Sequence, residues 1–257
     1  MQEKIKAVLD ELSKTRGVLS ATVIGSHLFQ LTNEKSDIDL IAVYLPSRYE
    51  MLMGFPQYEG SHAVDNLVKT AGGVELMLVP LHSFLRKLTN GHMQYVEALF
   101  AEPVWTSDCW NDVLQLKDRV VTKALINAII GYCRNTIKYF VNSQGYLDEH
   151  CEKTIRDIKE GKCKRHIDVI QCHRMCHELY RLMSIGDMKF GEKFYNPRLY
   201  MKIKSKDFTL DDLHLIMDEL TKITLMTFEK SKAYNFDNAI TEQSFAPVIS
   251  KAYQIQC

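Results

Sequence analysis

Two short motifs, each next to an apolar run, most constrain how the N-terminal part of this chain can fold. Gly25-Ser26 follows the apolar run Ala21–Ile24, and ten residues later Asp37 and Asp39 precede the apolar run Leu40–Leu45. Short apolar runs bounded by polar and turn residues are typical of buried β-strands. The order therefore predicts a strand, a glycine turn with a short helix, and a second strand that begins with two acidic residues.

The acidic residues predict a divalent-cation site. Asp37 and Asp39 are two residues apart, so on a strand both side chains would lie on one face. Two carboxylates that close repel each other, and a divalent cation relieves the repulsion. Mg²⁺ (or Mn²⁺) is the expected ion, because Mg²⁺ takes carboxylate oxygens together with substrate phosphates. The alternative interpretation of this pair is ordinary loop polarity.

Glu75 is the expected third ligand. It is the charged residue of the otherwise apolar run Val74–Val79. A charge in a buried strand is costly unless it has a partner or a metal ion. The alternative interpretation is a salt bridge to a helix lysine or arginine.

Gly25 and Ser26 supply the other half of the predicted site. Glycine lets the backbone approach a phosphate closely, and the helix start that follows presents unpaired N–H groups. The serine hydroxyl adds a further donor. Together with the carboxylates, this pattern predicts metal-assisted phosphoryl or nucleotidyl transfer, in which the protein supplies positioning and charge.

At these residues the chain resembles the DNA polymerase β-type nucleotidyltransferases, whose pattern is hydrophobic-Gly-Ser, a spacer, Asp-hydrophobic-Asp-hydrophobic and a later third carboxylate. The segment after Glu75 is similar to the stand-alone bacterial and phage branch associated with RNA repair. The matching residues are Phe84-Leu85, Gly91 and Glu97–Phe100. The resemblance covers residues 18–101 well and 165–230 weakly.

The resemblance implies transfer of a nucleoside monophosphate from a nucleoside triphosphate (NTP) to a hydroxyl acceptor. By motif position, Asp37, Asp39 and Glu75 would be catalytic metal ligands, and Gly25 and Ser26 would bind the triphosphate.

Three positions depart from the pattern. Glu75 stands where aspartate is usual in this branch, and His27 stands where an arginine often follows Gly-Ser. Gln171 replaces a histidine expected three residues before Arg174. These departures bear on the choice of nucleotide and acceptor more than on the metal chemistry.

Residue periodicity predicts an α+β fold class, with strands and helices over residues 1–110 and an all-helical domain with a C-terminal tail over residues 111–257. The resemblance implies that residues 1–110 form a mixed-sheet, polymerase β-like nucleotidyltransferase domain. The expected strands are Val18–Ile24, Ile38–Leu45, His62–Thr70 and Val74–Val79. The expected helices are 3–15, 26–31, 83–88, 95–100, 112–142, 146–160, 165–185 and 209–232, with a break over 186–198.

Composition narrows the classes of protein and partner. Lysine plus arginine and aspartate plus glutamate both total 32, so no overall basic field attracts nucleic acid. No apolar run approaches the roughly 18 residues of a membrane span. The seven cysteines are scattered and odd in number, and the N-terminus lacks the apolar core of a signal peptide. Reduced thiols and a cytoplasmic location are expected.

Two further clusters carry open alternatives. The region 163–177 contains cysteines and histidines at helical spacing, which predicts either a zinc site or buried free thiols with surface histidines; its members are Cys163, His166, Cys172, His173, Cys176 and His177. A basic stretch over 153–165 predicts contacts to the phosphates of a nucleic-acid acceptor or of the triphosphate tail, or else a solvated helix face.

The expected function is a divalent-metal-dependent nucleotidyltransferase whose acceptor is an RNA or tRNA end, a protein side chain or a small molecule. The alternative is a catalytically inactive nucleotide-sensing or protein-binding module whose helical half is the interaction surface.

Overall fold

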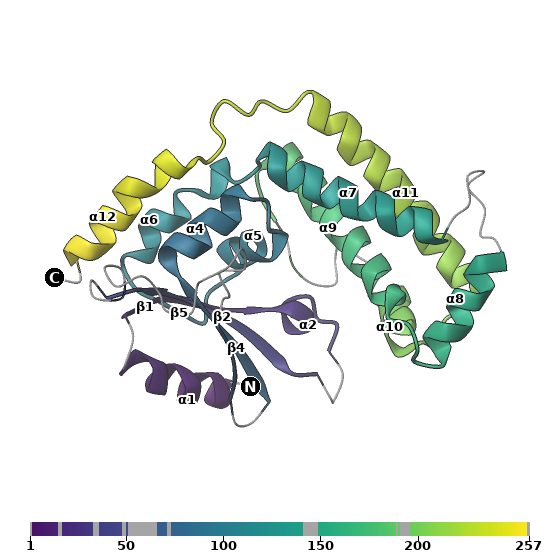
Figure 1. Ribbon diagram of the computed structural model, residues 1–257, viewed down its shortest axis with the longest axis horizontal. Coiled ribbons are helices and arrows are strands. Elements are labelled where there is room, and N and C mark those ends of the chain that lie inside the picture. The colour runs from purple at the N-terminus through teal and green to yellow at the C-terminus, as the bar shows by residue number, and fades with distance from the viewer. Residues whose placement is uncertain are drawn as a thin grey trace. The chain divides into compact units, whose positions relative to one another are not determined.

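The computed structural model describes residues 2–14, 17–32, 36–47, 50, 66–70, 73–140, 149–188, 190 and 196–255 (Figure 1). Its contacts divide the chain into two compact units, each described by itself below. The sheet unit comprises Met1–Val120 and Ala239–Cys257, and the helical unit comprises Val121–Asn238. Within the described ranges, no helix combines the length and the apolar character that crossing a lipid bilayer requires.

The sheet unit is built on a five-stranded mixed sheet in the order β3-β4-β2-β1-β5. The central strand β2 pairs antiparallel with β1 and parallel with β4, and the edge strands β3 and β5 pair antiparallel with β4 and β1. The strands are β1 (Gly17–Ile24), β2 (Ile38–Leu45), β3 (Asn66–Thr70), β4 (Val74–Pro80) and β5 (Trp105–Thr106).

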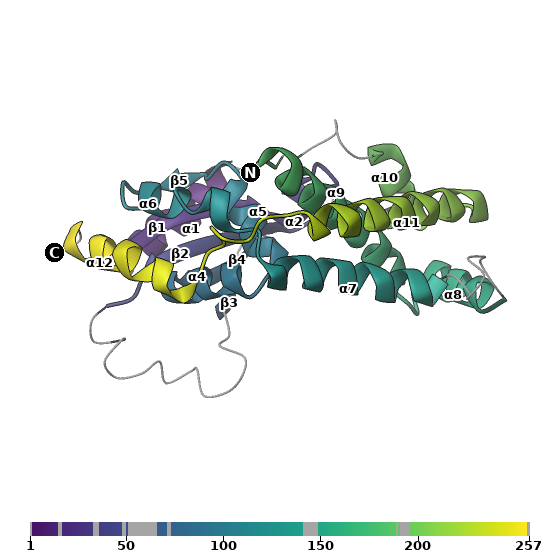
Figure 2. The ribbon, with the colours of Figure 1, turned by 90° about the horizontal axis from the view of Figure 1, so that it is seen from above.

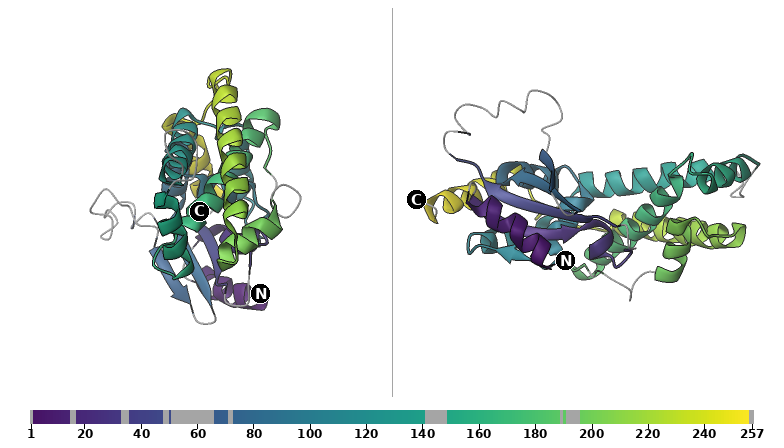
Figure 3. Two further views of the ribbon diagram at one scale, coloured as in Figure 1. Left: turned by 90° about the vertical axis from the view of Figure 1, so that its right-hand side faces the viewer. Right: turned by 90° about the horizontal axis from the view of Figure 1, so that it is seen from below.

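Helices cover the two faces of this sheet (Figures 1 and 3). On one face, α1 (Gln2–Ser13) buries Ile5, Leu9 and Leu12 against alternate residues of the strands, among them Leu40 and Leu76. The other face carries α4 (Leu81–Thr89) and α5 (Met93–Phe100). Because strand side chains alternate between faces, Asp39 and Ile41 lie opposite the α1 face.

The C-terminal segment also belongs to the sheet unit. The short helix η2 (Glu242–Ser244) and α12 (Phe245–Ile255) pack along α4. Lys251 Nζ lies 2.6 Å from Asp112 Oδ1, and the Tyr253 hydroxyl donates to the Pro46 carbonyl at 2.7 Å. This grouping differs from the expected division at residue 110, which assigned the C-terminal tail to the helical half.

In the helical unit, α7 and α11 run in nearly the same direction (Figure 2), α9 packs against both of them, and α10 packs on α9 and α11. Its helices are α7 (Lys123–Phe140), α8 (Glu149–Lys159), α9 (Arg165–Ile185), α10 (Pro197–Ser205) and α11 (Leu210–Lys232). The α+β class predicted from the sequence is confirmed: a mixed sheet precedes a mainly helical region.

Several predicted boundaries hold and several are wrong. The strand Ile38–Leu45 and the helix 165–185 have the predicted bounds. The single helix predicted over 112–142 is wrong: α6 (Trp110–Leu114) and a 3₁₀ turn (Lys117–Arg119) precede α7. The expected C-terminal tail contains a helix, α12. Residues 62–65 of the expected strand His62–Thr70 lie outside the described residues.

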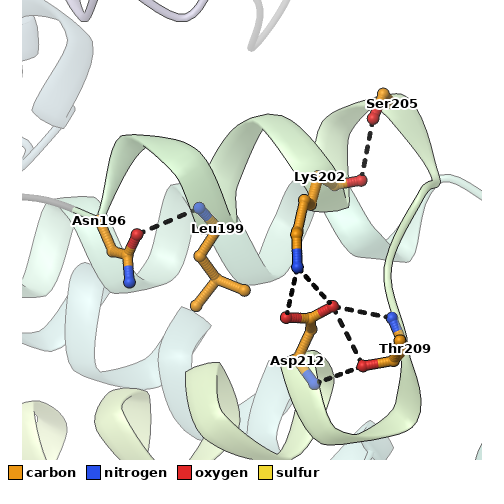
Figure 4. Close-up of polar contacts among 6 residues, drawn as sticks. All are labelled: Asn196, Leu199, Lys202, Ser205, Thr209 and Asp212. Carbon is orange, nitrogen blue, oxygen red and sulfur yellow. Dashed lines mark hydrogen bonds and ion pairs between the residues drawn. The ribbon is translucent and has the colours of Figure 1, made fainter.

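Local side-chain hydrogen bonds fix where α10 and α11 begin (Figure 4). The Asn196 side chain accepts from the Leu199 N–H at 3.1 Å, with Pro197 in the first turn of α10. Thr209 and Asp212 form a capping box at α11, because each side chain accepts from the other residue's backbone N–H. Lys202 Nζ lies 3.3 Å from Asp212 Oδ1, which connects the two helices.

Removing the cap of α11 should lower the stability of the helical unit. Thr209→Ala removes the side-chain acceptor of the Asp212 N–H, and we expect the free energy of unfolding to fall by about 1 kcal/mol. Urea unfolding followed by circular dichroism measures the change. Ser205→Ala, which removes an exposed hydrogen bond to the Lys202 carbonyl, is the matched control and should stay within about 0.5 kcal/mol of wild type. Equal effects for both variants would contradict the capping role.

Candidate functional site

The sheet register places Asp39 beside Glu75. These residues are partners in the parallel pairing of β2 with β4, so their side chains leave the same face of the sheet. Neighbouring strands are separated by about 4.8 Å, which puts the two Cβ atoms at nearly that distance. Both residues are half-buried, so the carboxylates lie at the margin of the core. The backbone thus places Asp39 and Glu75, which the sequence names as metal ligands, at adjacent positions of neighbouring strands.

The other neighbour of Asp39 is the end of β1. Ile24 is the register partner of Asp39 in the antiparallel pair, and Gly25 follows it with φ of 63°. A Cβ placed on Gly25 would lie 2.3 Å from Asp39 Oδ2, which is far inside van der Waals contact. Glycine is therefore required at this position twice, for the left-handed backbone and for the close approach of the carboxylate.

Asp37 lies just before β2 and is exposed. The backbone N–H of Ile38 donates to the carbonyl of Gly73 at 2.9 Å, which anchors this point to the start of β4. A Cβ on Gly73 would lie 3.7 Å from Asp37 Oδ1, so the Asp37 carboxylate lies toward the turn that precedes β4. The Asp39 carboxylate lies toward Gly25, so the two aspartates approach different neighbouring strands.

These positions matter for metal binding. Among the described residues, no group of three or more histidine, cysteine, aspartate or glutamate side chains is arranged to hold a metal ion. The structure thus brings Asp39 and Glu75 to adjacent strand positions but does not bring Asp37, Asp39 and Glu75 together as one ligand set. The magnesium site stays a prediction.

Ser26 lies in α2 (Gly25–Leu28), a single turn of helix rather than the predicted 26–31. Its carbonyl accepts from the Leu31 N–H at 2.9 Å, and its side chain is half-buried. His27 follows, and its Nε2 atom is buried without a hydrogen-bond partner among the described residues. Gly25, Ser26 and His27 therefore form one compact turn directly beside Asp39.

The cysteine- and histidine-rich region 163–177 is mostly interior. Cys172 and Cys176 are buried, as expected of free thiols, whereas His166 and His173 are also buried, so the expectation of surface histidines is wrong for these two. In the part of the chain that the structure covers, these side chains do not form a metal-ligand group. Cys163 is partly exposed.

His173 is the centre of a polar network inside the helical unit. Its Nδ1 atom forms a short hydrogen bond with the Tyr200 hydroxyl, and its Nε2 atom lies 3.5 Å from Glu219 Oε2 without hydrogen-bond geometry. Burial, and to a lesser degree the neighbouring His177, lower the pKa of His173 to about 3. His173 is therefore neutral at pH 7 despite the nearby carboxylate.

A cavity of about 460 Å³ opens beside this network in the helical unit. It is lined by residues of α9 and α11 and by the residue that caps α10: His177, Tyr180, Asn196, Glu219, Lys222, Ile223 and Met226. Sequence reasoning missed this cavity. Its polar residues come from three helices and form no local motif, so only the packing of the helices brings them together.

The predicted basic stretch contains both paired and solvated cations. Lys162 pairs with Glu160 at 2.5 Å, and Arg165 lies 3.6 Å from Asp168 and stacks on the Tyr139 ring. Exposed ion pairs of this kind contribute little to stability.

Comparisons with known proteins find likeness in structure but not in sequence. No protein-family model matches the sequence, and no curated protein matches it either. Among solved structures, the chain is similar to the crystal structure of a nucleotidyltransferase-like protein from Exiguobacterium sibiricum 255-15. The likeness covers 99% of this chain and 89% of that chain, with 12% sequence identity and a TM-score of 0.34. A likeness at this level does not establish a common function.

The contact between Gly25 and Asp39 gives a test with a matched control. In Gly25→Ala, the alanine must adopt a left-handed backbone conformation and its Cβ must displace the Asp39 carboxylate. In the control Gly186→Ala, the backbone is also left-handed, with φ of 71°, but the new Cβ meets open space. The backbone alone costs about 1–2 kcal/mol. We expect a larger loss of unfolding free energy for Gly25→Ala in urea unfolding. Equal losses would show that the carboxylate moves aside without resistance.

The neutral state of His173 predicts a pH dependence of stability. Because its folded-state pKa of about 3 lies below the unfolded value of about 6.5, the unfolded chain binds more protons between these values. Stability is therefore fully present above pH 6.5 and falls as the pH drops, by up to about 1.4 kcal/mol per pH unit from this group. Burial also lowers the pKa of His177 and His166, which acts in the same direction.

Urea unfolding at pH 7, 6 and 5 measures this slope. We expect His173→Gln to lower stability at pH 7 but to flatten the dependence on pH, since glutamine does not titrate. His214→Gln changes an exposed histidine of α11 and should keep the wild-type slope. An unchanged slope in His173→Gln would refute the assignment.

Proposed function

We propose that this chain is a divalent-metal-dependent nucleotidyltransferase that moves a nucleoside monophosphate from an NTP to a hydroxyl acceptor and releases pyrophosphate. The observation that carries the proposal is the register of β2, which sets Asp39 between Gly25 at the end of β1 and Glu75 on β4. This arrangement fits the order of a glycine-serine turn and acidic strand residues from which the function was predicted.

The donor set fits a hard divalent cation. Asp39 and Glu75 offer carboxylate oxygens from adjacent strands. Asp37 lies two residues before Asp39, directly before the start of β2. Such oxygens are the ligands that Mg²⁺ and Mn²⁺ take. When bound, the ions would neutralise triphosphate charge and lower the pKa of the acceptor hydroxyl. The three acids would hold the ions, and binding requires the Asp37 carboxylate to turn from Gly73 toward Asp39.

Gly25 and Ser26 would contact the triphosphate. With no side chain on Gly25, a phosphate oxygen can approach the backbone next to the Asp39 carboxylate. Ser26 would donate its hydroxyl to the phosphate. We propose an RNA or tRNA end, a protein hydroxyl or a small molecule as the acceptor, and ATP or another NTP as the donor.

Thermal melting tests the nucleotide site. We expect Mg²⁺ plus an NTP to raise the melting temperature of the wild-type chain, because a ligand that binds only the folded state stabilises it. Asp39→Asn should remove this rise, and Glu75→Gln should reduce it. Asp108→Asn, which changes an exposed carboxylate of the sheet unit, is the control and should keep the rise. A full rise in Asp39→Asn would refute the assigned role of Asp39.

Incubation with each α-phosphate-labelled NTP, Mg²⁺ and total RNA, tRNA or protein tests catalysis. Label transferred to one acceptor, and lost in Asp39→Asn, supports the proposal. Label in none of them, with nucleotide binding verified by melting, argues against catalysis.

A second candidate is a nucleotide-sensing or protein-binding module that acts through the helical unit. The observation that favours it is the cavity of about 460 Å³, whose size lies within the range of small-molecule sites and which the proposed catalytic residues do not line. Binding at this cavity that survives Asp39→Asn but not Glu219→Gln, without label transfer, would favour this candidate.

A further inference from the structure

Three thiols gather in the interior of the helical unit. Cys133 on α7 and Cys172 and Cys176 on α9 are fully buried. The Sγ atom of Cys133 lies 3.5 Å from the Sγ atom of Cys176 and 3.5 Å from the carbonyl oxygen of Cys172. Cys172 is held differently, since its thiol donates to the Thr136 hydroxyl at 3.2 Å.

The surroundings of Cys176 favour its reactive form. The pKa of the Cys176 thiol lies below its usual value, chiefly because Cys133 hydrogen-bonds to it and also because the hydroxyls of Thr224 and Thr227 do. The Thr224 hydroxyl lies 3.7 Å from the Cys176 sulfur. The hydrogen bonds with Cys172 and Cys176, together with burial, raise the pKa of Cys133. Cys176 is therefore the attacking thiol of the pair.

We propose that Cys133 and Cys176 are a site of oxidative modification, where a peroxide converts the two thiols into a disulfide that cross-links α7 to α9. The sulfur atoms are 3.5 Å apart, and a disulfide bond is about 2.05 Å long. To form the bond, the two sulfur atoms need to approach each other by about 1.5 Å. This inference is independent of the proposed nucleotidyl transfer.

The chemistry balances with hydrogen peroxide as the oxidant. The Cys176 thiolate attacks one peroxide oxygen, the O–O bond breaks, and the departing hydroxide takes up the thiol proton as water. The Cys133 thiolate then attacks the sulfur of the Cys176 sulfenic acid, the S–O bond breaks, and a second water leaves with the Cys133 proton. Two thiols lose two electrons and two protons, and one peroxide becomes two waters.

The other described cysteines provide internal comparisons. Cys109 is buried in the sheet unit and Cys163 is partly exposed near the start of α9. Within the described part of the chain, the close sulfur–sulfur contact is that of Cys133 with Cys176 and involves neither Cys109 nor Cys163, so these two should stop at monothiol products. A peroxide is small enough to reach the buried pair when the helices open locally. The sulfur atoms of Cys133 and Cys176 already lie side by side when the peroxide arrives.

The cross-link should tighten the helical unit. It would close the chain segment 134–175, which contains α8, and thereby reduce the conformational freedom of the unfolded chain. For a loop of this length, the melting temperature should rise by roughly 5 °C or more.

Peroxide treatment of the full chain tests the proposal. The chain is exposed until Cys163 is fully oxidised, remaining thiols are alkylated under denaturing conditions, and peptides are mapped by mass spectrometry. We expect a peptide pair joined through Cys133 and Cys176, with a mass lower by two hydrogens and reversed by dithiothreitol. Cys133→Ala and Cys133→Ser should abolish it, and Cys163→Ser should leave it.

The opposing outcomes are equally distinct. Three results in the peroxide-treated wild-type chain would each overturn the assignment: alkylated Cys133 and Cys176, a disulfide between Cys133 and Cys172, or sulfinic acid at Cys176. This map is made on wild type, so it decides the question even where a substitution at Cys133 prevents folding. A melting temperature that does not rise in the mapped disulfide form would overturn the inferred tightening of the helical unit.

Discussion

The pairing of β2 with strands on both sides controls the candidate site. Antiparallel pairing with β1 brings Ile24 and then Gly25 to Asp39, and parallel pairing with β4 brings Glu75 to the same residue. Both pairings are made by backbone hydrogen bonds, so they do not depend on the rotamers of the side chains. A shift of one residue in either pairing would move Asp39 to the face that packs on α1. The apolar residues Ile38 and Leu40, buried against α1, therefore fix the orientation of Asp39.

The close approach of Gly25 to Asp39 makes the turn and the carboxylate one unit. Any side chain at position 25 would compete with Asp39 Oδ2 for the same space. The Asp37 carboxylate lies toward Gly73 and not toward Gly25. Asp37 precedes the first residue of β2, so the alternation of side chains between the two faces of the strand does not fix its direction. Like charges on neighbouring positions disfavour convergence, so the positions of the two aspartates accord with electrostatics as well as geometry.

Sequence reasoning succeeded where the signal is local. The strand Ile38–Leu45 follows from an apolar run ended by Pro46, and the helix 165–185 follows from its periodicity and the Gly186 stop. It failed where tertiary packing decides. The predicted helix 112–142 ignored the turn at 115–122, whose backbone makes 3₁₀-type bonds and accepts the Ile240 N–H from the distant C-terminal segment. The sequence named Asp39 and Glu75 as acids that share one site. It gave no signal that the Asp37 carboxylate lies toward Gly73, the residue before β4, because that contact depends on how the strands pair.

The helical unit shows why buried polar groups escape sequence reasoning. His173 and Arg174 are adjacent on α9, yet each has a different partner: the Tyr200 hydroxyl from α10 bonds His173 Nδ1, and Glu178 one turn along α9 pairs with Arg174. An ionised side chain in this interior needs a partner, which Arg174 has at 3.1 Å, whereas His173 remains neutral. Cys176 lies one turn beyond Cys172 on the same helix and meets Cys133 from α7. Helix α9 thus carries an ion pair formed within the helix itself, together with an imidazole and a thiol whose partners come from α10 and α7.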